Sequence, residues 1–324
     1  MEYTRLGNTG IRVSVAGLGC GGPSLLGLKQ DKSGGLSISL VRQAIDLGVN
    51  FFDTAEGYGT EHVVGQAIAD VPRDRLVIST KKTLLVSDAE NPEREIRRSL
   101  EQSLKQLRTD YVDIYHVHGV DLKDYGYAKE RFLPVFKKLR AEGKIRAIGI
   151  TEHFVEDPTH TMLQQALQDN CWDVIMVGFN LLVPCARRNI FPLAKKQDVG
   201  VIGMYAVRSG LSQPARLKAL CQSLVEQGFV ASDSLNSDEP LDFVIRAGAL
   251  TVPEAAYRFC RHESGMDVVL TGTGNPEHLQ ANIASILKPP LPDPILARLE
   301  RTFGGPVGKK GSLRTTAGDA KSKA

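Results

Sequence analysis

The sequence predicts an α/β fold, a (β/α)8 TIM barrel with an N-terminal β-hairpin and with extra helices before strand eight and at the C-terminus. Two observations support this prediction. Eight short apolar runs recur along the 324 residues, and longer segments with apolar residues at helical spacing separate them. Alternating strands and helices favour a parallel sheet with right-handed crossovers, and eight such units close into a barrel.

The eight apolar runs are the expected barrel strands, and they cover residues 15–19, 50–54, 76–80, 112–118, 145–150, 174–177, 201–204 and 268–270. Helical spacing of apolar residues is clearest at residues 38–47, 92–107, 132–141 and 188–196. Gly48, Gly143 and Gly200 each come just before a strand and mark the end of the preceding helix.

Further elements are expected outside the eight units. Residues 4–6 and 11–13 flank a turn at residues 7–10, which predicts a hairpin under the barrel. The long connection before the eighth strand has room for helices near residues 237–246 and 253–262. We expect one domain over residues 1–303, followed by a flexible tail over residues 304–324 that lacks periodicity.

Composition excludes several classes of function. The net charge is +3 without a clustered basic face, which argues against nucleic acid as a partner. The five cysteines are scattered and form no C-x-x-C pair, so a disulfide framework or a zinc site is not expected and a reducing cytosol fits. The N-terminal residues carry no apolar signal region, and no apolar run is long enough for a membrane span. We therefore expect a cytoplasmic protein without a membrane partner.

Reactive side chains stand where strands end, which is the face of a barrel that carries active sites. The second run ends in Asp53 and leads to Tyr58, the third is followed by Lys81 and Lys82, and the fourth carries His116 and His118. Each has an ordinary structural explanation: a helix N-cap, a loop aromatic, a solvated lysine, a core histidine. Strand alternation, however, directs one lysine inward, where a carboxylate from the neighbouring strand can pair with it.

Together these residues predict acid–base chemistry at a phenol. A cation near Tyr58 would lower the pKa of its hydroxyl from about 10 toward neutrality, so that it could donate or accept a proton. Asp53 would hold Lys81, and His118 would hydrogen-bond an oxygen of the substrate. This equipment suits interconversion of a carbonyl and an alcohol, and it requires a hydride-carrying cofactor.

The sequence resembles the aldo-keto reductase superfamily over about residues 3 to 303. The motifs that carry the resemblance are FFDTAEGYG at 51–59, ISTKK at 78–82, DYVDIYHVH at 110–118, GKIRAIGIT at 143–151 and TGTGNPEHLQANI at 271–283. The resemblance implies a catalytic tetrad of Asp53, Tyr58, Lys81 and His118. It also implies an NAD(P)-dependent oxidoreductase, with NADP(H) expected ahead of NAD(H) and a small carbonyl or alcohol compound as substrate.

The resemblance also implies where the cofactor lies. The carboxamide of the nicotinamide is expected near Thr151 and Glu152, and the ring over Tyr205. The remaining expected contacts are the pyrophosphate loop Ser209, Gly210 and Leu211, the adenosine segment Gly272, Thr273, Gly274, His278 and Asn282, and the first strand end at Cys20 and Gly21. Many members have Asn, Gln and basic residues where this chain has Glu152, Met176 and His278. A Gly-rich loop that leads into a helix also suits phosphate on physical grounds.

Two alternatives stay open at this point. His116 and His118 share one strand face and could be ligands of a metal-dependent hydrolase, although Lys81 would repel the cation. A non-catalytic redox sensor that only retains the cofactor is the second alternative. The substrate and the oligomeric state are also open: residues 25–35, 120–128 and 180–187 would wall the pocket, and the polar residues at 121–127 suit either a sugar or water.

Overall fold

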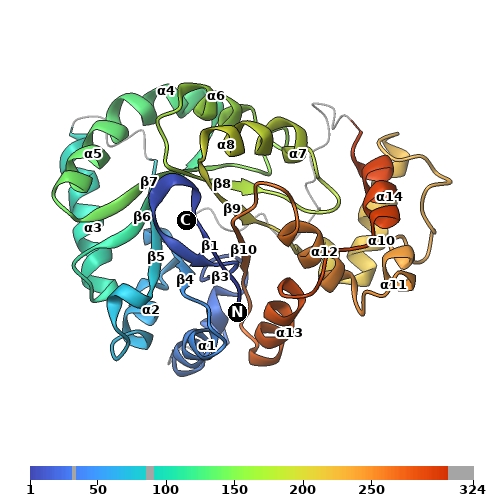
Figure 1. The fold of residues 1–324 in the computed structure, drawn as a ribbon, viewed down its shortest axis with the longest axis horizontal. Helices are drawn as coiled ribbons and strands as arrows, with labels where there is room; N and C mark the ends of the chain where they lie inside the picture. The colour runs from blue at the N-terminus through green and yellow to red at the C-terminus, as the bar shows by residue number, and fades with distance from the viewer. Residues whose placement is uncertain (31–33, 85–90, 306–324) are drawn as a thin grey trace.

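The computed structural model describes residues 1–30, 34–84 and 91–305. Eight strands of this part of the chain form a closed, all-parallel barrel, which confirms the predicted fold class (Figure 1). In order around the barrel they are β3 (Ala16–Gly19), β4 (Phe51–Asp53), β5 (Val77–Thr83), β6 (Val112–Val120), β7 (Ile145–Glu152), β8 (Val174–Gly178), β9 (Gly200–Met204) and β10 (Val268–Thr271), which pairs again with β3.

The predicted hairpin closes the amino-terminal end of the barrel. β1 (Tyr3–Arg5) and β2 (Arg12–Ser14) pair antiparallel around the short helix η1 (Gly7–Thr9). The Asn8 amide donates to the carbonyl of Asp198, just before β9, at 2.7 Å. Leu6 and Ile11 pack against the inward-facing residues of the strands. The hairpin therefore seals the barrel on the side opposite the strand ends that carry the candidate site.

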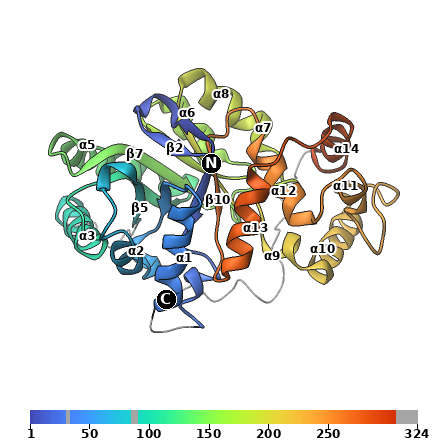
Figure 2. The same cartoon turned by 60° about the horizontal axis from the view of Figure 1, so that its bottom comes forward.

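Helices surround the barrel on its outer side (Figure 2). Among the described residues, no helix is both long enough and apolar enough to cross a membrane. The α-helices are α1 (Gly35–Asp46), α2 (Glu61–Ala67), α3 (Pro92–Leu107), α4 (Tyr125–Tyr127), α5 (Leu133–Ala141), α6 (Thr161–Asp169), α7 (Ala186–Asn189), α8 (Phe191–Gln197), α9 (Ser209–Ser212), α10 (Pro214–Glu226), α11 (Asp242–Arg246), α12 (Val252–Arg261), α13 (Pro276–Ile286) and α14 (Asp293–Phe303). Short helical turns are η2 (Leu25–Gly27), η3 (Glu56–Tyr58), η4 (Arg73–Arg75), η6 (Leu122–Asp124) and η7 (Ala128–Phe132).

Two predicted helices differ from the observed ones. The segment at residues 188–196 contains two helices that meet at Ile190, because Pro192 has no N–H to donate to the turn before it. The helix predicted at residues 237–246 begins only at Asp242. The Asn236 side chain accepts from the amides of Asp238 and Glu239 and holds this stretch as a turn.

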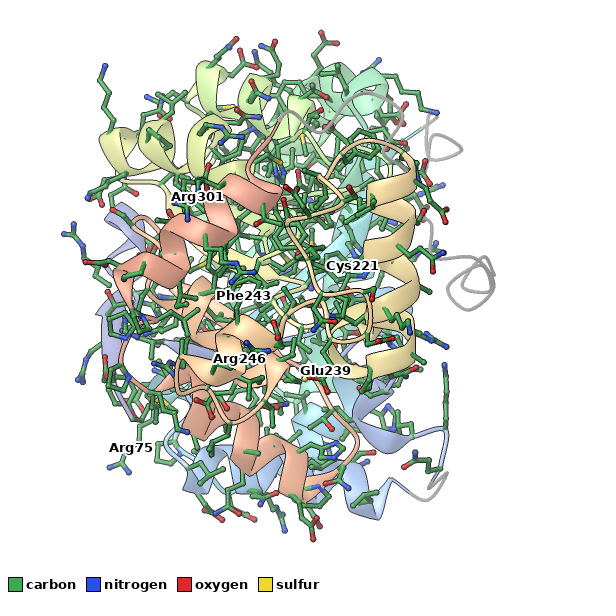
Figure 3. All side chains as sticks on the ribbon, turned by 90° about the vertical axis from the view of Figure 1, so that its right-hand side faces the viewer. Arg75, Cys221, Glu239, Phe243, Arg246 and Arg301 are labelled. Carbon is green, nitrogen blue, oxygen red and sulfur yellow. The ribbon has the colours of Figure 1, made fainter. Side chains whose placement is uncertain are left out.

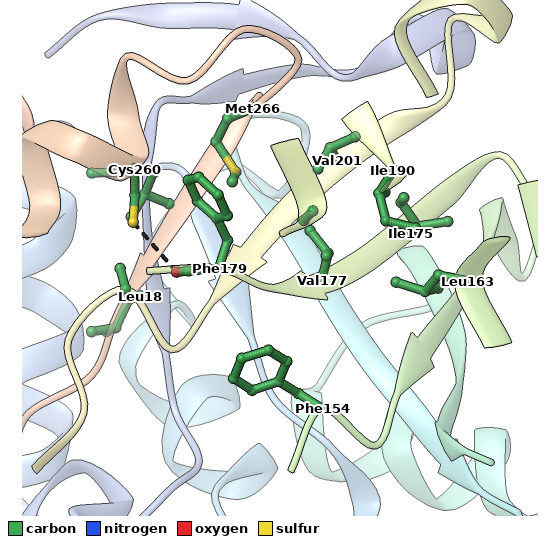
Figure 4. Packing of buried hydrophobic residues seen from close by; sticks show 14 of the residues in the cluster. Leu18, Phe154, Leu163, Ile175, Val177, Phe179, Ile190, Val201, Cys260 and Met266 are labelled. Atoms are coloured by element: carbon green, nitrogen blue, oxygen red, sulfur yellow. Dashed lines mark hydrogen bonds between the residues drawn. The ribbon is translucent and has the colours of Figure 1, made fainter. Parts of the chain in front are cut away.

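The core has an inner and an outer part. Phe51, Val77 and Ile114 fill the barrel interior, while a larger cluster lies between the strands and the helices. Figure 4 shows this outer cluster around β8 and β9, where the Cys260 thiol donates to the carbonyl of Phe179 at 3.4 Å. The barrel interior is therefore packed at its amino-terminal end, and polar side chains gather only toward the other end.

Three helices form a group beside the barrel ring. α10, α11 and α14 lie together on one side (Figures 1 and 3). Phe243 of α11 is buried between them, and the Arg298 guanidinium lies 4.0 Å from the centre of its ring. α10 occupies part of the connection where only the later helices were predicted. The predicted tail is outside the described residues from 306 onward, as are residues 31–33 of one expected pocket wall.

Candidate active site at the carboxyl ends of the strands

Asp53 and Lys81 form a buried ion pair inside the barrel mouth. Lys81 Nζ donates to Asp53 Oδ2 and to the carbonyl of Thr54, each at 2.6 Å, and Ser79 Oγ donates to Asp53 Oδ1 at 2.8 Å. Asp53 and Ser79 are in register on neighbouring strands, and alternation places Ser79 and Lys81 on the same face. The next lysine, Lys82, points the other way toward the carboxylate of Glu56, which agrees with the choice of Lys81.

Tyr58 and His118 complete the group. Tyr58 Oη lies 3.3 Å from His118 Nε2, and Lys81 Nζ lies 5.0 Å from the centre of the Tyr58 ring. The two rings meet edge to face with their centres 5.5 Å apart. The four side chains predicted as a tetrad are thus brought together, from β4, β5, β6 and the turn after β4.

The turn that carries Tyr58 is held by Glu56, which the sequence did not single out. Glu56 Oε1 accepts from the Thr83 amide at 2.8 Å and from Lys82 Nζ at 3.3 Å, while Ser99 Oγ donates to the other carboxylate oxygen. A carboxylate with three donors from β5 and α3 fixes the loop against the barrel. A signal was present in the sequence, since Glu56 lies two residues before Tyr58.

Gly21 has a packing reason for being glycine in addition to the predicted approach of a ligand. A Cβ at this position would lie 2.6 Å from Tyr58 Cδ2 and 2.7 Å from Cζ, inside the ring's van der Waals surface. The prediction was an approach to the cofactor or substrate, whereas the side-chain atoms that approach Gly21 belong to Tyr58. Cys20 is fully buried and its thiol faces the carbonyl of Leu18 at 3.6 Å, so in this conformation it offers no surface to a ligand.

The predicted lowering of the Tyr58 pKa is wrong for this arrangement. Burial, followed by the carboxylate of Asp53, raises the pKa of the Tyr58 hydroxyl well above 10. Lys81 Nζ donates hydrogen bonds to Asp53 and to the Thr54 carbonyl. The ion pair of Lys81 and Asp53 therefore presents no net charge to Tyr58. Tyr58 is therefore a protonated phenol at neutral pH, which is the form that can donate a proton.

His118 is held in its neutral form. Burial, and then the nearby ammonium of Lys81, lower the pKa of His118 from 6.5 to about 3. A neutral imidazole carries one donor and one acceptor nitrogen. It can therefore share a hydrogen bond with Tyr58 at one nitrogen while keeping the opposite role at the other.

This shift predicts how stability depends on pH. The unfolded chain binds a proton at His118 below pH 6.5 and the folded chain does not until about pH 3. The free energy of unfolding should therefore fall as the pH drops from 6.5, by up to ~1.4 kcal/mol per pH unit from this group. Urea denaturation at pH 6.5 and 4.5 measures it, and His118→Asn should show the smaller fall. Equal falls in the two proteins would contradict the assignment.

His116 lies in the barrel interior beside Gly149, whose missing side chain leaves room for its ring. Within the part of the chain that the structure describes, neither of its ring nitrogens has a hydrogen-bond partner. Across residues 1–30, 34–84 and 91–305, no group of three His, Cys, Asp or Glu side chains could hold a metal ion. The metal-hydrolase hypothesis thus finds no ligand set in the part of the chain that the structure covers.

Thr151 and Glu152, expected at the carboxamide of the nicotinamide, bond to neighbouring strand ends instead. Thr151 Oγ1 accepts from the Gly119 amide at 2.7 Å, which ties β7 to β6. Glu152 Oε1 accepts from the Gly178 amide at 2.8 Å, which ties β7 to β8. The Glu152 side chain is fully buried and is also paired with His160, so here it cannot face a cofactor.

Tyr205 lies at the end of β9 in a left-handed backbone conformation, with φ at 64° and 40% of its surface exposed. A non-glycine residue in this conformation is strained, and such residues are frequent at functional sites. The Arg208 guanidinium lies 4.7 Å from the centre of its ring. The predicted pyrophosphate residues Ser209, Gly210 and Leu211 form α9 directly after it.

The predicted adenosine segment follows β10 and opens α13. Asn275 accepts from the His278 amide at 2.9 Å and caps this helix, and Asn282 Nδ2 donates to Thr271 Oγ1 at 2.9 Å. The Thr273 hydroxyl accepts from the Asn275 amide. A helix N-terminus at a barrel strand end fits a phosphate group. The two glycines have packing reasons as well, since Cβ atoms would crowd Gly19 at Gly272 and Gly27 at Gly274.

Comparison with known proteins agrees with this geometry. The profile of the Aldo/keto reductase family matches residues 18–302. The chain is 27% identical to L-galactose dehydrogenase of Arabidopsis thaliana, with 88% of each protein covered. It is 28% identical to NADH-specific methylglyoxal reductase of Escherichia coli, with 88% of this chain and 94% of that protein covered. A holo aldo-keto reductase of Bacillus halodurans has the same fold, with a TM-score of 0.70 at 23% identity over 93% of this chain and 96% of that one.

The chain therefore belongs to the aldo/keto reductase family. This places it among the nicotinamide-dependent oxidoreductases that act on small carbonyl compounds.

Proposed function

We propose that the protein reduces the carbonyl group of a small aldehyde, ketone or sugar to the alcohol, with Tyr58 as the general acid. The observation that carries the proposal is a protonated Tyr58 hydroxyl 3.3 Å from the neutral imidazole of His118, at the mouth of the barrel. A proton donor and a hydrogen-bond donor side by side suit a carbonyl oxygen, which gains negative charge as a hydride reaches its carbon.

Each residue of the tetrad then has one role. A bound nicotinamide cofactor supplies the hydride. Tyr58 gives its proton to the carbonyl oxygen, His118 orients that oxygen, and Asp53 fixes the ammonium of Lys81 behind the phenol. That ammonium attracts the phenolate left after the transfer, because opposite charges attract strongly in a buried site, and it offsets part of the opposing effect of burial and Asp53. In the reverse direction the same phenolate would accept the proton of an alcohol.

The chemistry of the relatives supports a small polar substrate. The relatives include L-galactose dehydrogenase, NADH-specific methylglyoxal reductase and D-threo-aldose 1-dehydrogenase, whose substrates are sugars or a short oxygen-rich carbonyl compound. We propose the cytosol as the location, because the five cysteines are free thiols. We also propose that residues 1–303 form one domain.

For the cofactor we propose NADP(H) ahead of NAD(H), but by less than about tenfold. The resemblance favours NADP(H), and the lack of positive charge in the adenosine segment limits how strong that preference can be. Residues 271–283 include no Lys or Arg, so within this segment only His278 could meet a 2′-phosphate. An arginine that bonded the 2′-phosphate through two N–H groups would increase the preference for NADP(H) more than His278 can, because charge-assisted hydrogen bonds are the strong ones. One relative is an NADH-specific enzyme.

The test is a titration of the purified protein with NADPH and NADH, followed by turnover of aldehydes, ketones and aldoses measured by the loss of absorbance of the reduced cofactor. We expect binding of both cofactors, dissociation constants within about tenfold of each other, and turnover that survives a chelator. Activity lost to the chelator without cofactor oxidation would favour the hydrolase. Tight binding without turnover of any carbonyl would favour the redox sensor.

Gly21→Ala should strongly impair this reaction. The added methyl overlaps the Tyr58 ring and must displace it, and a misplaced catalytic group can lower kcat by about a hundredfold. Gly57→Ala is the matched control, because its Cβ would meet only Thr83 Oγ1, at 4.0 Å. Steady-state kinetics should show kcat near the wild-type value for the control. A fully active Gly21→Ala enzyme would mean that this glycine does not position Tyr58.

A further inference from the structure

A chain of three buried side chains lies behind the strand ends of β7 and β8. His160 Nδ1 is 2.9 Å from Glu152 Oε2, and His160 Nε2 is 3.3 Å from the thiol sulfur of Cys185, which faces the carbonyl of Pro158 at 2.9 Å. His160 and Glu152 have fully buried side chains. His160 also sits in a left-handed backbone conformation, with φ at 62°. A fully bonded imidazole in a strained position indicates that its placement matters.

The ring of His160 is the inner end of an aromatic stack. Phe154 lies almost parallel to it with centres 5.7 Å apart, and Tyr205 lies almost parallel to Phe154 at the same separation. Phe154 rests directly on Gly178, where a Cβ would overlap its ring. In Figure 4 the Phe154 ring lies apart from the aliphatic side chains of Val201 and Ile190. The three rings therefore connect a buried ion pair to the exposed Tyr205 at the mouth.

Glu152 joins the two parts of this arrangement. One of its oxygens accepts from the amide of Gly178, the residue under Phe154, and the other pairs with His160, the residue stacked on Phe154. Phe154 is therefore in contact both with the backbone of β8 and with the imidazole. The ring is nearly inaccessible, with 2% of its surface exposed.

We propose that Glu152, His160 and Phe154 form a positioning unit that fixes the Tyr205 ring as the platform for the nicotinamide of the cofactor. The inference rests on the proposed function and extends it, because it assigns Glu152 an indirect role through the stack in place of a contact with the carboxamide. Burial is the largest single effect and lowers the pKa of His160, but the charge and hydrogen bond of Glu152 together with Cys185 raise that pKa to about 10. A charged imidazole stacked on Phe154 gains a cation–π attraction that a neutral side chain lacks.

The unit predicts a separation between binding and chemistry. Without it, Tyr205 loses its support and the cofactor must order the ring when it binds, at a cost in affinity. The tetrad lies on β4, β5 and β6, whereas the unit connects β7, β8 and β9. Once the cofactor is bound at saturation, proton transfer from Tyr58 should proceed at nearly the wild-type rate.

The experiment compares His160→Gln and Phe154→Leu with the wild type by fluorescence titration with NADPH and NADH, and then by kcat at saturating cofactor. We expect the dissociation constants to rise about five- to twentyfold while kcat changes less than about threefold. This loss corresponds to removal of one or two aromatic contacts. Phe154→Tyr keeps the ring and should recover most of the affinity.

The matched control is Arg73→Gln. It removes one of the two arginine partners of another buried carboxylate, Asp113, at 2.7 Å, but at the amino-terminal end of the barrel. It should lower stability in urea without changing either dissociation constant. If Arg73→Gln weakens cofactor binding as much as the stack variants do, the effect is general loss of stability and the inference is overturned. Variants of His160 and Phe154 that bind the cofactor as tightly as the wild type also overturn the inference, but they leave the proposed function standing. A wild-type chain that binds neither dinucleotide overturns the proposed function together with it.

Discussion

Tyr58→Phe should lower kcat by about a hundredfold to ten-thousandfold, the usual contribution of a positioned general acid, while cofactor binding stays unchanged. The substitution removes one oxygen atom. The remaining ring keeps its place against Gly21 and its position 5.0 Å from Lys81 Nζ. What disappears is the proton that the hydroxyl would deliver to the carbonyl oxygen, together with its hydrogen bond to His118.

The measurement pairs steady-state kinetics with a fluorescence titration of the reduced cofactor. His118→Asn is the informative companion, because it removes the orienting imidazole but leaves the acid. It should raise KM for the carbonyl and lower kcat less than Tyr58→Phe does. Turnover at the wild-type rate in Tyr58→Phe would remove this tyrosine from the reaction and leave the site without a proton donor.

The arrangement of the tetrad could be predicted from sequence because parallel strands end at the same face. Asp53, Lys81 and His118 each lie at or just after the end of a recognisable apolar run, and the resemblance then assigned them to one site. Alternation required only that one of the two lysines face inward, and the choice of Lys81 came from the resemblance; in the structure Lys81 pairs with Asp53 and Lys82 with Glu56. Local pattern was sufficient here because the partners lie on neighbouring strands in register.

The electrostatics of the site could not be predicted in the same way. The expected shift of the Tyr58 pKa followed from one neighbour, Lys81, whereas burial and Asp53 determine the observed direction. Burial depends on every segment that covers the mouth, including Gly21 in the loop after β3. A sequence shows which charges are nearby in the chain, but it does not show how much water they keep.

The apolar pattern of the sequence also could not predict where the side chains at the ends of β7 and β9 point. Glu152 lies where the resemblance expects a cofactor contact, yet its carboxylate pairs with His160, eight residues later in an irregular segment. No periodicity marks His160, whose backbone is left-handed and precedes α6. The position of α10 could not be predicted either, because the residues before β10 show no strand or hairpin pattern that would limit where a helix lies.

Lys81→Met should lower the free energy of unfolding by ~3–5 kcal/mol, because it leaves a buried carboxylate without its cation. The ammonium donates 2.6 Å hydrogen bonds to Asp53 and to the Thr54 carbonyl, and neither side chain of the pair reaches water appreciably. Urea denaturation at pH 7 measures the loss. Arg5→Met, which breaks an exposed pair with Asp198, is the control and should change stability little.

The double variant Asp53→Asn with Lys81→Met separates stability from chemistry. An amide is uncharged and can still accept the hydrogen bond from Ser79 Oγ, so the double variant should be more stable than Lys81→Met alone. Turnover should stay low in both, since neither has an ammonium to stabilise the phenolate of Tyr58. Stability losses that simply add would show that the two side chains are not coupled as a pair. Recovery of turnover in the double variant would show that the ion pair serves folding and that the charge behind Tyr58 is not needed for catalysis.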